Sequence, residues 1–376
     1  EMNMKRVYNK IILIITHMLL KIEIFKTWSA EWIAILRKRA LYKDVKWTKE
    51  QQKQFDDFWK KNYGKRISNR WHKLYQASNG VFHIDYLPEI IFSTKIEPAL
   101  NDTAYCKVFS DKNLNELFFD KKIDGVRTPK CFLCNSYGRF YDGNKHIISK
   151  EKAIEILSNV GAAVIKPTVD SSSGENVIIV DMKNGLNVRD GKSALHIIDS
   201  YNMNFIVQEK IIPNEELSTL YPKSINTLRV ISYCVGDRVE VAPISLRIGG
   251  GGSEIDNIHS GGLSVAVSND GKLAKKAYRL GYGNSFESFE KHPDTDVLFG
   301  DYELSFVERM ISVSKELHML TANIGVISWD LTVDDNDNIV IIEANFKGQS
   351  IWFPQMLSGK TFFGEDLVDI LKEIRK

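Results

Sequence analysis

Two runs of β-branched and other apolar residues, Ile327–Val333 and Ile339–Asn345, lie near the end of the sequence and are separated by an acidic, Asn-rich turn. This is the pattern of a β-hairpin. The first run carries Asp330 among apolar neighbours, and the second ends with Glu343 and Asn345. Glu343 and Asn345 are two positions apart, so both side chains project from one face of a strand. Antiparallel pairing can bring Asp330 close to them.

Three oxygen-bearing side chains that converge on one point suit Mg²⁺, which prefers hard oxygen ligands. A carboxylate pair is costly to bury in an apolar hairpin unless a cation accompanies it. The alternative is a solvated hairpin whose acids face water. The sequence therefore predicts a magnesium site formed by Asp330, Glu343 and Asn345.

The length of 376 residues allows two or three domains, and 43% hydrophobic with 26% charged residues is typical of globular proteins. The four cysteines are too few and too scattered for a secreted disulfide framework. Cys131 and Cys134 have metal-ligand spacing, but no second Cys/His pair follows, so we interpret them as packing residues. These observations favour a reducing, cytoplasmic compartment.

Charge is distributed unevenly along the chain. Residues 1–75 hold 18 Lys/Arg and 7 Asp/Glu, a net charge of 18 − 7 = +11, and the total of +2 leaves −9 for the remainder. A basic arm on an acidic body suggests an anionic partner. Within the arm, Ile11–Leu20 is apolar, but it has about half of the roughly 20 residues that a spanning helix needs.

Two interpretations of Ile11–Leu20 remain open. The segment is a helix packed on the body, or a basic amphipathic segment on an anionic membrane face, which would make the protein peripheral at the membrane. No small-residue cleavage site follows closely, which disfavours a signal peptide.

The residues after the apolar segment divide into a helical and a stranded region. From Trp28 to about Ala77, aromatic and basic residues alternate with helical periodicity. Solvated Lys faces on amphipathic helices explain this pattern better than nucleic-acid binding. Short strands are expected at Val81–Ile84, at Pro88–Phe92, and at Cys131–Tyr141 around a turn.

Candidate phosphate-binding elements follow. A strand at Val164–Thr168 carries Lys166, and a Ser/Gly-rich turn leads to a second strand at Val177–Val180. Such a turn can donate N–H and hydroxyl groups to polyphosphate, and a lysine adds a point charge. The turn residues concerned are Ser171, Ser172, Ser173 and Gly174. Neither standard phosphate motif occurs. The sequence contains no G-x-x-x-x-G-K-[ST], and the Gly249–Gly252 run lacks the spacing of a dinucleotide fingerprint.

Further strands follow in a definite order. They are expected at Phe205–Pro213, at Asn226–Ile231 with Arg229, and at Val241–Arg247. The Gly-rich segment 249–262 comes next and contains Asn257 and His259.

In this order the elements resemble the ATP-grasp superfamily, and more closely its sugar-transfer-associated branch, over residues 75–376. The resemblance is carried by several short motifs: Asp111-Lys112, Ile165-Lys166-Pro167 with the Ser/Gly turn, Gln208-Glu209, Asn226-Thr227-Leu228-Arg229, Asp256-Asn257 with Gly261-Gly262, and Trp329-Asp330 with Glu343-Ala344-Asn345.

The resemblance implies an α+β, ATP-grasp fold in which two α+β lobes clasp ATP. It divides the chain into a basic helical region (1–76), a preceding α/β segment (77–150), a small lobe with the phosphate loop and hinge (151–212), and a large lobe with the metal site (213–376). ATP and Mg²⁺ are the implied cofactors. The ATP-binding residues would be Lys112, Lys166, Ser171, Ser172, Ser173, Gly174, Gln208, Glu209, Lys210, Ile211, Asn226 and Asn257, with mainly backbone contacts at the hinge 207–212.

Arg229 and Arg247 are the candidate catalytic residues. Phosphoryl transfer depends on positioning and charge neutralisation, and the guanidinium fork can grip a γ-phosphate or an acylphosphate. A structural salt bridge is the alternative for each arginine. The Gly-rich segment 249–262 is a candidate lid that would exclude water, or else an ordinary surface loop.

Three functions are open. The first is an ATP-dependent carboxylate–amine ligase, with a carboxylated sugar in capsule or surface-polysaccharide biosynthesis as a candidate substrate. The second is an ATP-grasp kinase that phosphorylates a hydroxyl. The third is a non-catalytic nucleotide-binding scaffold whose basic arm docks to a membrane or to polysaccharide-assembly enzymes. No nucleic-acid partner is expected.

Overall fold

The computed structural model describes residues 21–169, 176–256, 261–280 and 286–374. Several predicted elements lie outside these residues: Ile11–Leu20, Ser171, Ser172, Ser173, Gly174, Asn257 and His259. Spatial contacts group the chain into two compact units, Glu1–Leu100 with Gly348–Lys376, and Asn101–Lys347. The four-part division of the sequence stays a prediction.

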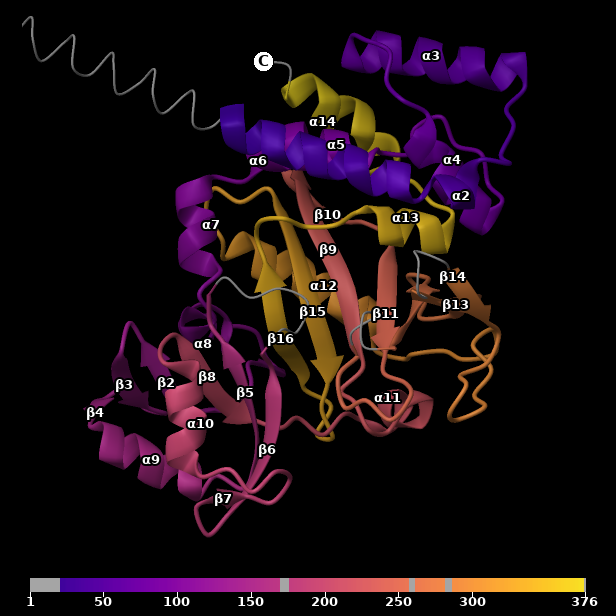
Figure 1. Cartoon of the computed structure of the whole chain (residues 1–376). Helices are drawn as coiled ribbons and strands as arrows, with labels where there is room; N and C mark the ends of the chain where they lie inside the picture. Colours follow the sequence, from indigo (N-terminus) through magenta and orange to yellow (C-terminus); the bar gives the residue numbers. More distant parts are fainter. Residues whose placement is uncertain (1–20, 170–175, 257–260, 281–285, 375–376) are drawn as a thin grey trace, which may run out of the picture. The chain divides into compact units, whose positions relative to one another are not determined.

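The described residues of the first unit form helices and connecting turns. The aromatic and basic periodicity predicted this for Trp28 to about Ala77. Residues 21–37 form the first described helix (indigo in Figure 1). Thr48 and Gln51 form a reciprocal cap at the start of α3, and Gly64 with a φ of 87° ends that helix. The other helices are α2 (Arg39–Tyr42), α3 (Lys49–Tyr63), α4 (Arg70–Asn79), α5 (Glu89–Ile91), the π-helical turn η1 (Phe92–Ile96), α6 (Glu97–Leu100), α13 (Trp352–Ser358), η5 (Gly364–Asp366) and α14 (Leu367–Glu373).

Two predicted strands of the first unit were wrong. Pro88–Phe92 is helical, because Pro88 takes an extended conformation before the first turn of α5 and the chain then continues into the π-helical turn. Val81–Ile84 forms no strand. Residues 89–92 are all buried, and a short apolar run without polar alternation does not distinguish a buried helix from a strand.

The aromatic core of the first unit encloses His72, and we expect this histidine to make the protein acid-labile. Burial lowers the pKa of His72 to about 3. The unfolded state then binds a proton that the folded state does not, so stability falls as pH drops below about 6.5, by about 2 kcal/mol at about pH 5. Urea unfolding of the parent and of His72→Phe at about pH 7 and 5 checks this. The variant should lose less stability on acidification, whereas His146→Phe, at an exposed site, should behave as the parent does.

The second unit contains a nine-stranded sheet in the order β1-β16-β15-β9-β11-β12-β13-β14, with β10 also paired to β9 (Figure 1). All its pairs are antiparallel except the β1–β16 pair. The strands are β1 (Val126–Arg127), β9 (Thr227–Val235), β10 (Arg238–Val241), β11 (Ile244–Ile248), β12 (Leu263–Val267), β13 (Leu273–Leu280), β14 (Phe286–Phe289), β15 (Val326–Val333) and β16 (Ile339–Asn345).

A second, antiparallel sheet has the order β4-β3-β2-β8-β5-β6-β7. The predicted pair around the Ser/Gly turn is β5 with β6, and β8 lies between β2 and β5. Its strands are β2 (Cys131–Ser136), β3 (Arg139–Asp142), β4 (Ile147–Ile148), β5 (Ala162–Pro167), β6 (Ile178–Lys183), β7 (Leu186–Asn187) and β8 (Phe205–Glu209). Cys131 and Cys134 are buried free thiols packed with Ile206.

Helices cover one face of each sheet in the second unit. On the nine-stranded sheet, α12 (Val307–Met319) packs on β9, β10 and β15. On the seven-stranded sheet, α9 (Lys150–Ser158) and α10 (Ala194–Tyr201) share a core with β5, β6 and β8. The remaining helices are α7 (Thr103–Phe109), η2 (Lys112–Leu114), α8 (Asn115–Phe119) and α11 (Glu215–Leu220). Apolar residues thus lie on the helix-covered face of the sheet, and the polar residues of the central strands lie on the opposite face.

The predicted hairpin is formed by β15 and β16. Buried Asp334 closes its turn by accepting hydrogen bonds from the backbone N–H groups of Asn336 and Asn338. Asp330 lies opposite Glu343, but Leu331 lies opposite Ile341, so Ile342 is an extra residue in β16. This bulge re-aims the end of β16, where the predicted metal ligands lie.

Candidate functional site

Four of the predicted site residues meet on the polar face of the nine-stranded sheet. Asp330 pairs across the strands with Glu343 on one side and with Arg229 of β9 on the other. Side chains of directly opposed residues lie on the same face of a sheet. Arg247 of β11 pairs with Thr227, two positions before Arg229, so it also belongs to this face. Four charged side chains from four adjacent strands are therefore neighbours.

Asp330 is the centre of this group. Arg229 grips its carboxylate in a bidentate manner, with Nε 2.9 Å from Oδ1 and an Nη 2.8 Å from Oδ2, and Arg247 places an Nη 3.0 Å from Oδ2. The carboxylate is buried. Burial alone would raise the pKa of Asp330, but the two guanidinium groups outweigh it, and the pKa lies below its usual range. Asp330 is therefore held as an anion.

Two residues that sequence reasoning missed hold Arg247 in place. The Arg247 guanidinium donates to the Thr227 hydroxyl at 2.8 and 3.1 Å. Asp256 in turn accepts from the Thr227 backbone N–H at 2.9 Å and lies 4.0 Å from Arg247 Nε. The period-two spacing of Thr227 and Arg229 was the available signal, since it places both on one strand face.

Two lysines reach the same region from the side of the seven-stranded sheet. Buried Lys112 of η2 places Nζ 3.0 Å from Glu343 Oε1, and its backbone N–H donates to the Thr168 carbonyl. Lys166 of β5 places Nζ 3.1 Å from the carbonyl oxygen of Ile342, the bulge residue. The bulge thus presents a carbonyl to one lysine and the following carboxylate to the other.

Lys166 is an under-compensated cation. Its ammonium has no carboxylate partner within 4.0 Å in the described part of the chain. Burial lowers the pKa of Lys166 to about 8, although Glu343 pulls it upward. A buried ammonium without a counter-ion is unfavourable. An anionic ligand at this point would relieve the cost.

The three predicted metal ligands suit a hard divalent cation unequally. Glu343 is partly exposed and Lys112 engages one of its carboxylate oxygens. The amide nitrogen of Asn345 is buried without a hydrogen-bond acceptor among the described residues; it is a donor, so only the amide oxygen of Asn345 could bind a cation. Asp330 already accepts three hydrogen bonds from arginine, so it retains less lone-pair capacity. The donor set fits Mg²⁺ mainly through Glu343 and Asn345.

No group of three or more His, Cys, Asp or Glu side chains in the described ranges could hold a metal ion. The predicted set contains two acids and an amide, and its metal role stays a prediction.

The side chains of the predicted hinge are engaged by the protein itself. Glu209 accepts from the guanidinium of Arg127 and from the Lys130 backbone N–H at 2.7 Å. Gln208 donates to the Pro129 carbonyl, and Lys210 Nζ lies 2.7 Å from Glu254. Ile211 is buried. The nucleotide contacts predicted for this hinge, mainly through backbone groups, stay a prediction.

Both polar atoms of the Asn226 side chain are hydrogen-bonded within the protein. It is fully buried with a φ of 48°, and its amide nitrogen donates to the Leu217 and Tyr221 carbonyls. Its amide oxygen accepts from the Ser224 hydroxyl and the Gly249 N–H. These contacts shape the start of β9 and the Gly-rich segment, and a role in nucleotide binding stays a prediction.

The sequence matches the family described as sugar-transfer associated ATP-grasp over residues 91–372. The chain belongs to this family. Its fold is accordingly the ATP-grasp fold, which confirms the predicted fold class of mixed α and β lobes after a helical N-terminal region. A comparison with curated proteins found no match.

Solved structures with a similar fold include three enzymes. The chain is 14% identical to VanG D-Ala:D-Ser ligase from Enterococcus faecalis, covering 73% of this chain and 63% of that one, with a TM-score of 0.42. It is 14% identical to an L-amino acid ligase from Bacillus licheniformis (70% and 48% covered, TM-score 0.37). It is 12% identical to biotin carboxylase from Campylobacter jejuni (73% and 48% covered, TM-score 0.42). The chain thus spans about half to just under two thirds of their lengths.

Proposed function

We propose that this chain is an ATP-dependent ligase that joins a carboxylate to an amine. The observation that supports it most is the partly buried, under-compensated ammonium of Lys166, which lies near Lys112, Glu343 and Asp330. A cation without sufficient counter-charge, next to oxygen donors that suit Mg²⁺, is what a polyphosphate bound with a metal requires.

Each residue has a defined task in this proposal. Lys166 and Lys112 hold phosphate oxygens as point charges. Arg247, and Arg229 beside it, present N–H groups toward charge that develops on a transferred phosphoryl group. Glu343 and Asn345 would hold Mg²⁺, which when bound neutralises phosphate charge. Because Asp330 fixes both guanidinium groups in advance, little reorganisation is needed during the reaction.

The resulting chemistry is activation of a carboxylate as an acylphosphate, followed by attack of an amine to give an amide, ADP and phosphate. The family description supports a sugar-linked substrate, and we propose a carboxylated sugar of capsule or surface-polysaccharide biosynthesis. The cytoplasmic location inferred from the cysteines belongs to the same proposal.

A screen of amines against uronic acids tests the function. ADP release that requires both partners, together with an amide product in mass spectrometry, is the expected result. ADP release with a single acceptor and a phosphorylated hydroxyl would establish a kinase instead. Failure to bind ATP would refute both.

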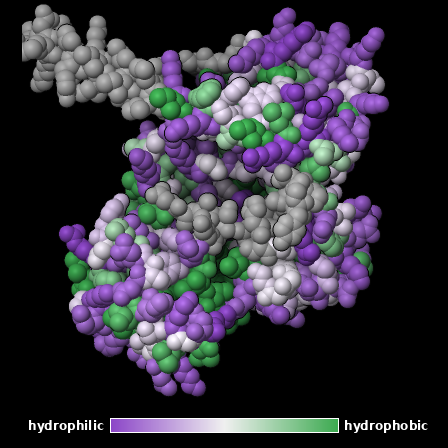
Figure 2. All heavy atoms as spheres, in the orientation of Figure 1, coloured by the Kyte–Doolittle hydropathy of each residue, from purple (hydrophilic) through white to green (hydrophobic). Residues whose placement is uncertain are grey.

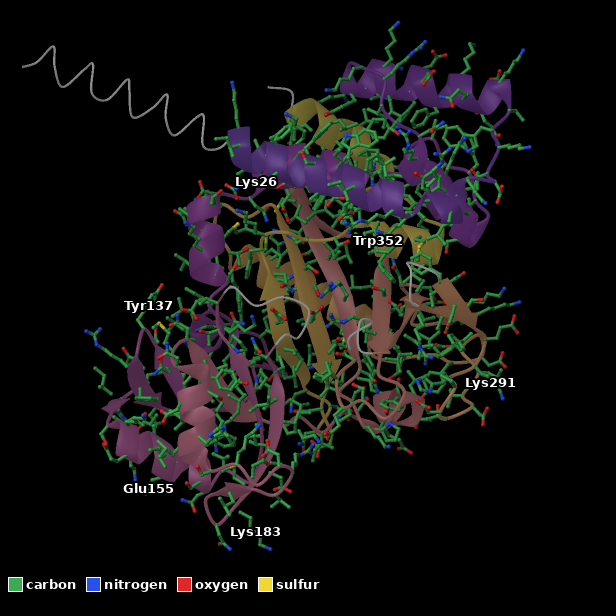
Figure 3. The ribbon with its side chains drawn as sticks, in the orientation of Figure 1. Lys26, Tyr137, Glu155, Lys183, Lys291 and Trp352 are labelled. Atoms are coloured by element: carbon green, nitrogen blue, oxygen red, sulfur yellow. The ribbon has the colours of Figure 1, made fainter. Side chains whose placement is uncertain are left out.

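We expect Lys166→Met to raise the Kd for ATP about 10- to 100-fold, because hydrogen bonds to charged groups contribute about 1.5–3 kcal/mol. Methionine keeps most of the buried volume and removes the charge. Calorimetric titration measures the effect. The control is Lys183→Met on β6, an exposed lysine that is labelled in Figure 3. Equal affinity in parent and Lys166→Met would make Lys166 a structural residue.

The affinity for ATP measured in this titration should also depend on pH. Because the pKa of Lys166 is about 8, the ammonium is charged below that pH and neutral above it. Affinity of the parent for ATP should therefore fall as pH rises through about 8, and binding above that pH should take up a proton. Lys166→Met should lack this dependence.

A further inference from the structure

The helix of residues 21–37 exposes large apolar side chains. Phe25 is 65% exposed, Ile22 and Ile33 are each 50% exposed, and Leu36 is 49% exposed. At 100° per residue these four positions fall within an arc of about 80°. We call these four residues the apolar stripe; Ser29 lies at the centre of its arc, between the two apolar pairs. Isolated exposed apolar residues, by contrast, are ordinary on protein surfaces. In Figure 2, hydrophobic side chains lie along this helix between hydrophilic ones.

The stripe has basic borders. Lys26 (labelled in Figure 3) and Arg37 follow it on one side of the helix, and Lys21 borders the other side. The two acids of the helix, Glu23 and Glu31, fall about 80° or more from the near edge of the stripe on the same geometry. The face therefore combines exposed apolar residues with cationic edges.

The side of the helix next to Phe25 is anchored to the first unit. Ile35 is buried and its carbonyl accepts from the Tyr42 hydroxyl at 3.1 Å. Trp32 stacks edge-on against buried Trp71 of α4, with ring centroids 5.4 Å apart. The helix is thus fixed along one side, and the exposed stripe lies next to that side.

We propose that this stripe docks on an anionic phospholipid bilayer, with the helix lying in the plane of the membrane surface. Charge complementarity favours this partner, because the +11 charge of residues 1–75 would attract anionic headgroups at Lys21, Lys26 and Arg37. The stacked pair Phe25–Trp28, with ring centroids 5.9 Å apart, suits the boundary between headgroups and acyl chains.

None of the described helices is long and apolar enough to cross a bilayer. The proposal is independent of the catalytic proposal, because it uses none of the residues on the polar sheet face.

Vesicle flotation of the full chain tests the docking. Vesicles of phosphatidylcholine with phosphatidylglycerol should carry the protein at low salt, and high salt should reduce binding, because the cationic edges are screened. Vesicles of phosphatidylcholine alone should bind less. Phe25→Ser with Ile33→Ser should weaken binding about tenfold or more. Ile147→Ser with Met319→Ser, at exposed apolar positions of the second unit, should leave it unchanged.

Three outcomes would overturn the proposal. The first is no binding to anionic vesicles at low salt. The second is full binding by the Phe25→Ser, Ile33→Ser variant, which would assign the membrane contact to another segment. The third is a concentration-dependent dimer in sedimentation equilibrium that the same variant abolishes without a vesicle effect, which would make the stripe a contact between two copies. ATP turnover of the variant should equal that of the parent.

Discussion

Glu343→Gln is expected to reduce ATP turnover about 10²- to 10³-fold while the fold stays intact. The Glu343 carboxylate lies opposite Asp330 in the hairpin, 3.0 Å from Lys112 Nζ, and remains partly exposed. Glutamine keeps the shape and one oxygen acceptor, but it lacks the negative charge that holds a divalent cation and balances Lys112. ADP formation in single-turnover experiments measures the effect.

The control for this variant is Glu287→Gln on β14, whose side chain is exposed and lies 4.0 Å from Arg279. It also removes one charge from an ion pair, but away from the polar sheet face around Asp330. Its turnover should equal that of the parent. Near-parental turnover in Glu343→Gln would refute the assignment of Glu343 to the metal site, even with the fold preserved.

The sequence predicted the local parts of this site well. The β15–β16 hairpin follows from its apolar runs and its turn, and the β5–β6 pair follows from the strands around the Ser/Gly segment. The two strands of each pair are close in sequence, so their pairing can be predicted without knowledge of the rest of the fold. The helices between Trp28 and about Ala77 could likewise be predicted from periodicity, whereas Pro88–Phe92 has none and was predicted wrongly.

The contacts between distant segments were beyond sequence reasoning. Arg229 and Asp330 are separated by 101 residues, and their pairing depends on β9 lying beside β15. Lys166 meets Ile342 only because a bulge interrupts β16 next to the seven-stranded sheet. From the sequence alone, Arg229 and Arg247 could each bind a phosphate or form a structural salt bridge. The structure shows the salt bridge in each case and leaves the phosphate role as a proposal.

Asp330 could serve as a metal ligand or as the partner of a buried ion pair, and the two roles predict different effects of its removal. If it served only as a metal ligand, its removal would affect activity and leave stability nearly unchanged. Its contacts indicate more, since two guanidinium groups surround one buried carboxylate. Removing one partner of a buried ion pair leaves the other charge without compensation, which costs about 3–5 kcal/mol.

We therefore expect Asp330→Ala to lower the free energy of unfolding by about 3–5 kcal/mol, measured by urea denaturation without nucleotide or metal. Asp335→Ala, an exposed acid in the same hairpin turn, should stay within about 0.5 kcal/mol of the parent. Adding Arg229→Met to Asp330→Ala should recover part of the loss, because one uncompensated cation is removed. A double-mutant cycle with no coupling energy would contradict the ion pair. Since Thr227 and Asp256 also contact Arg247, the coupling with Arg229 should be larger than that with Arg247.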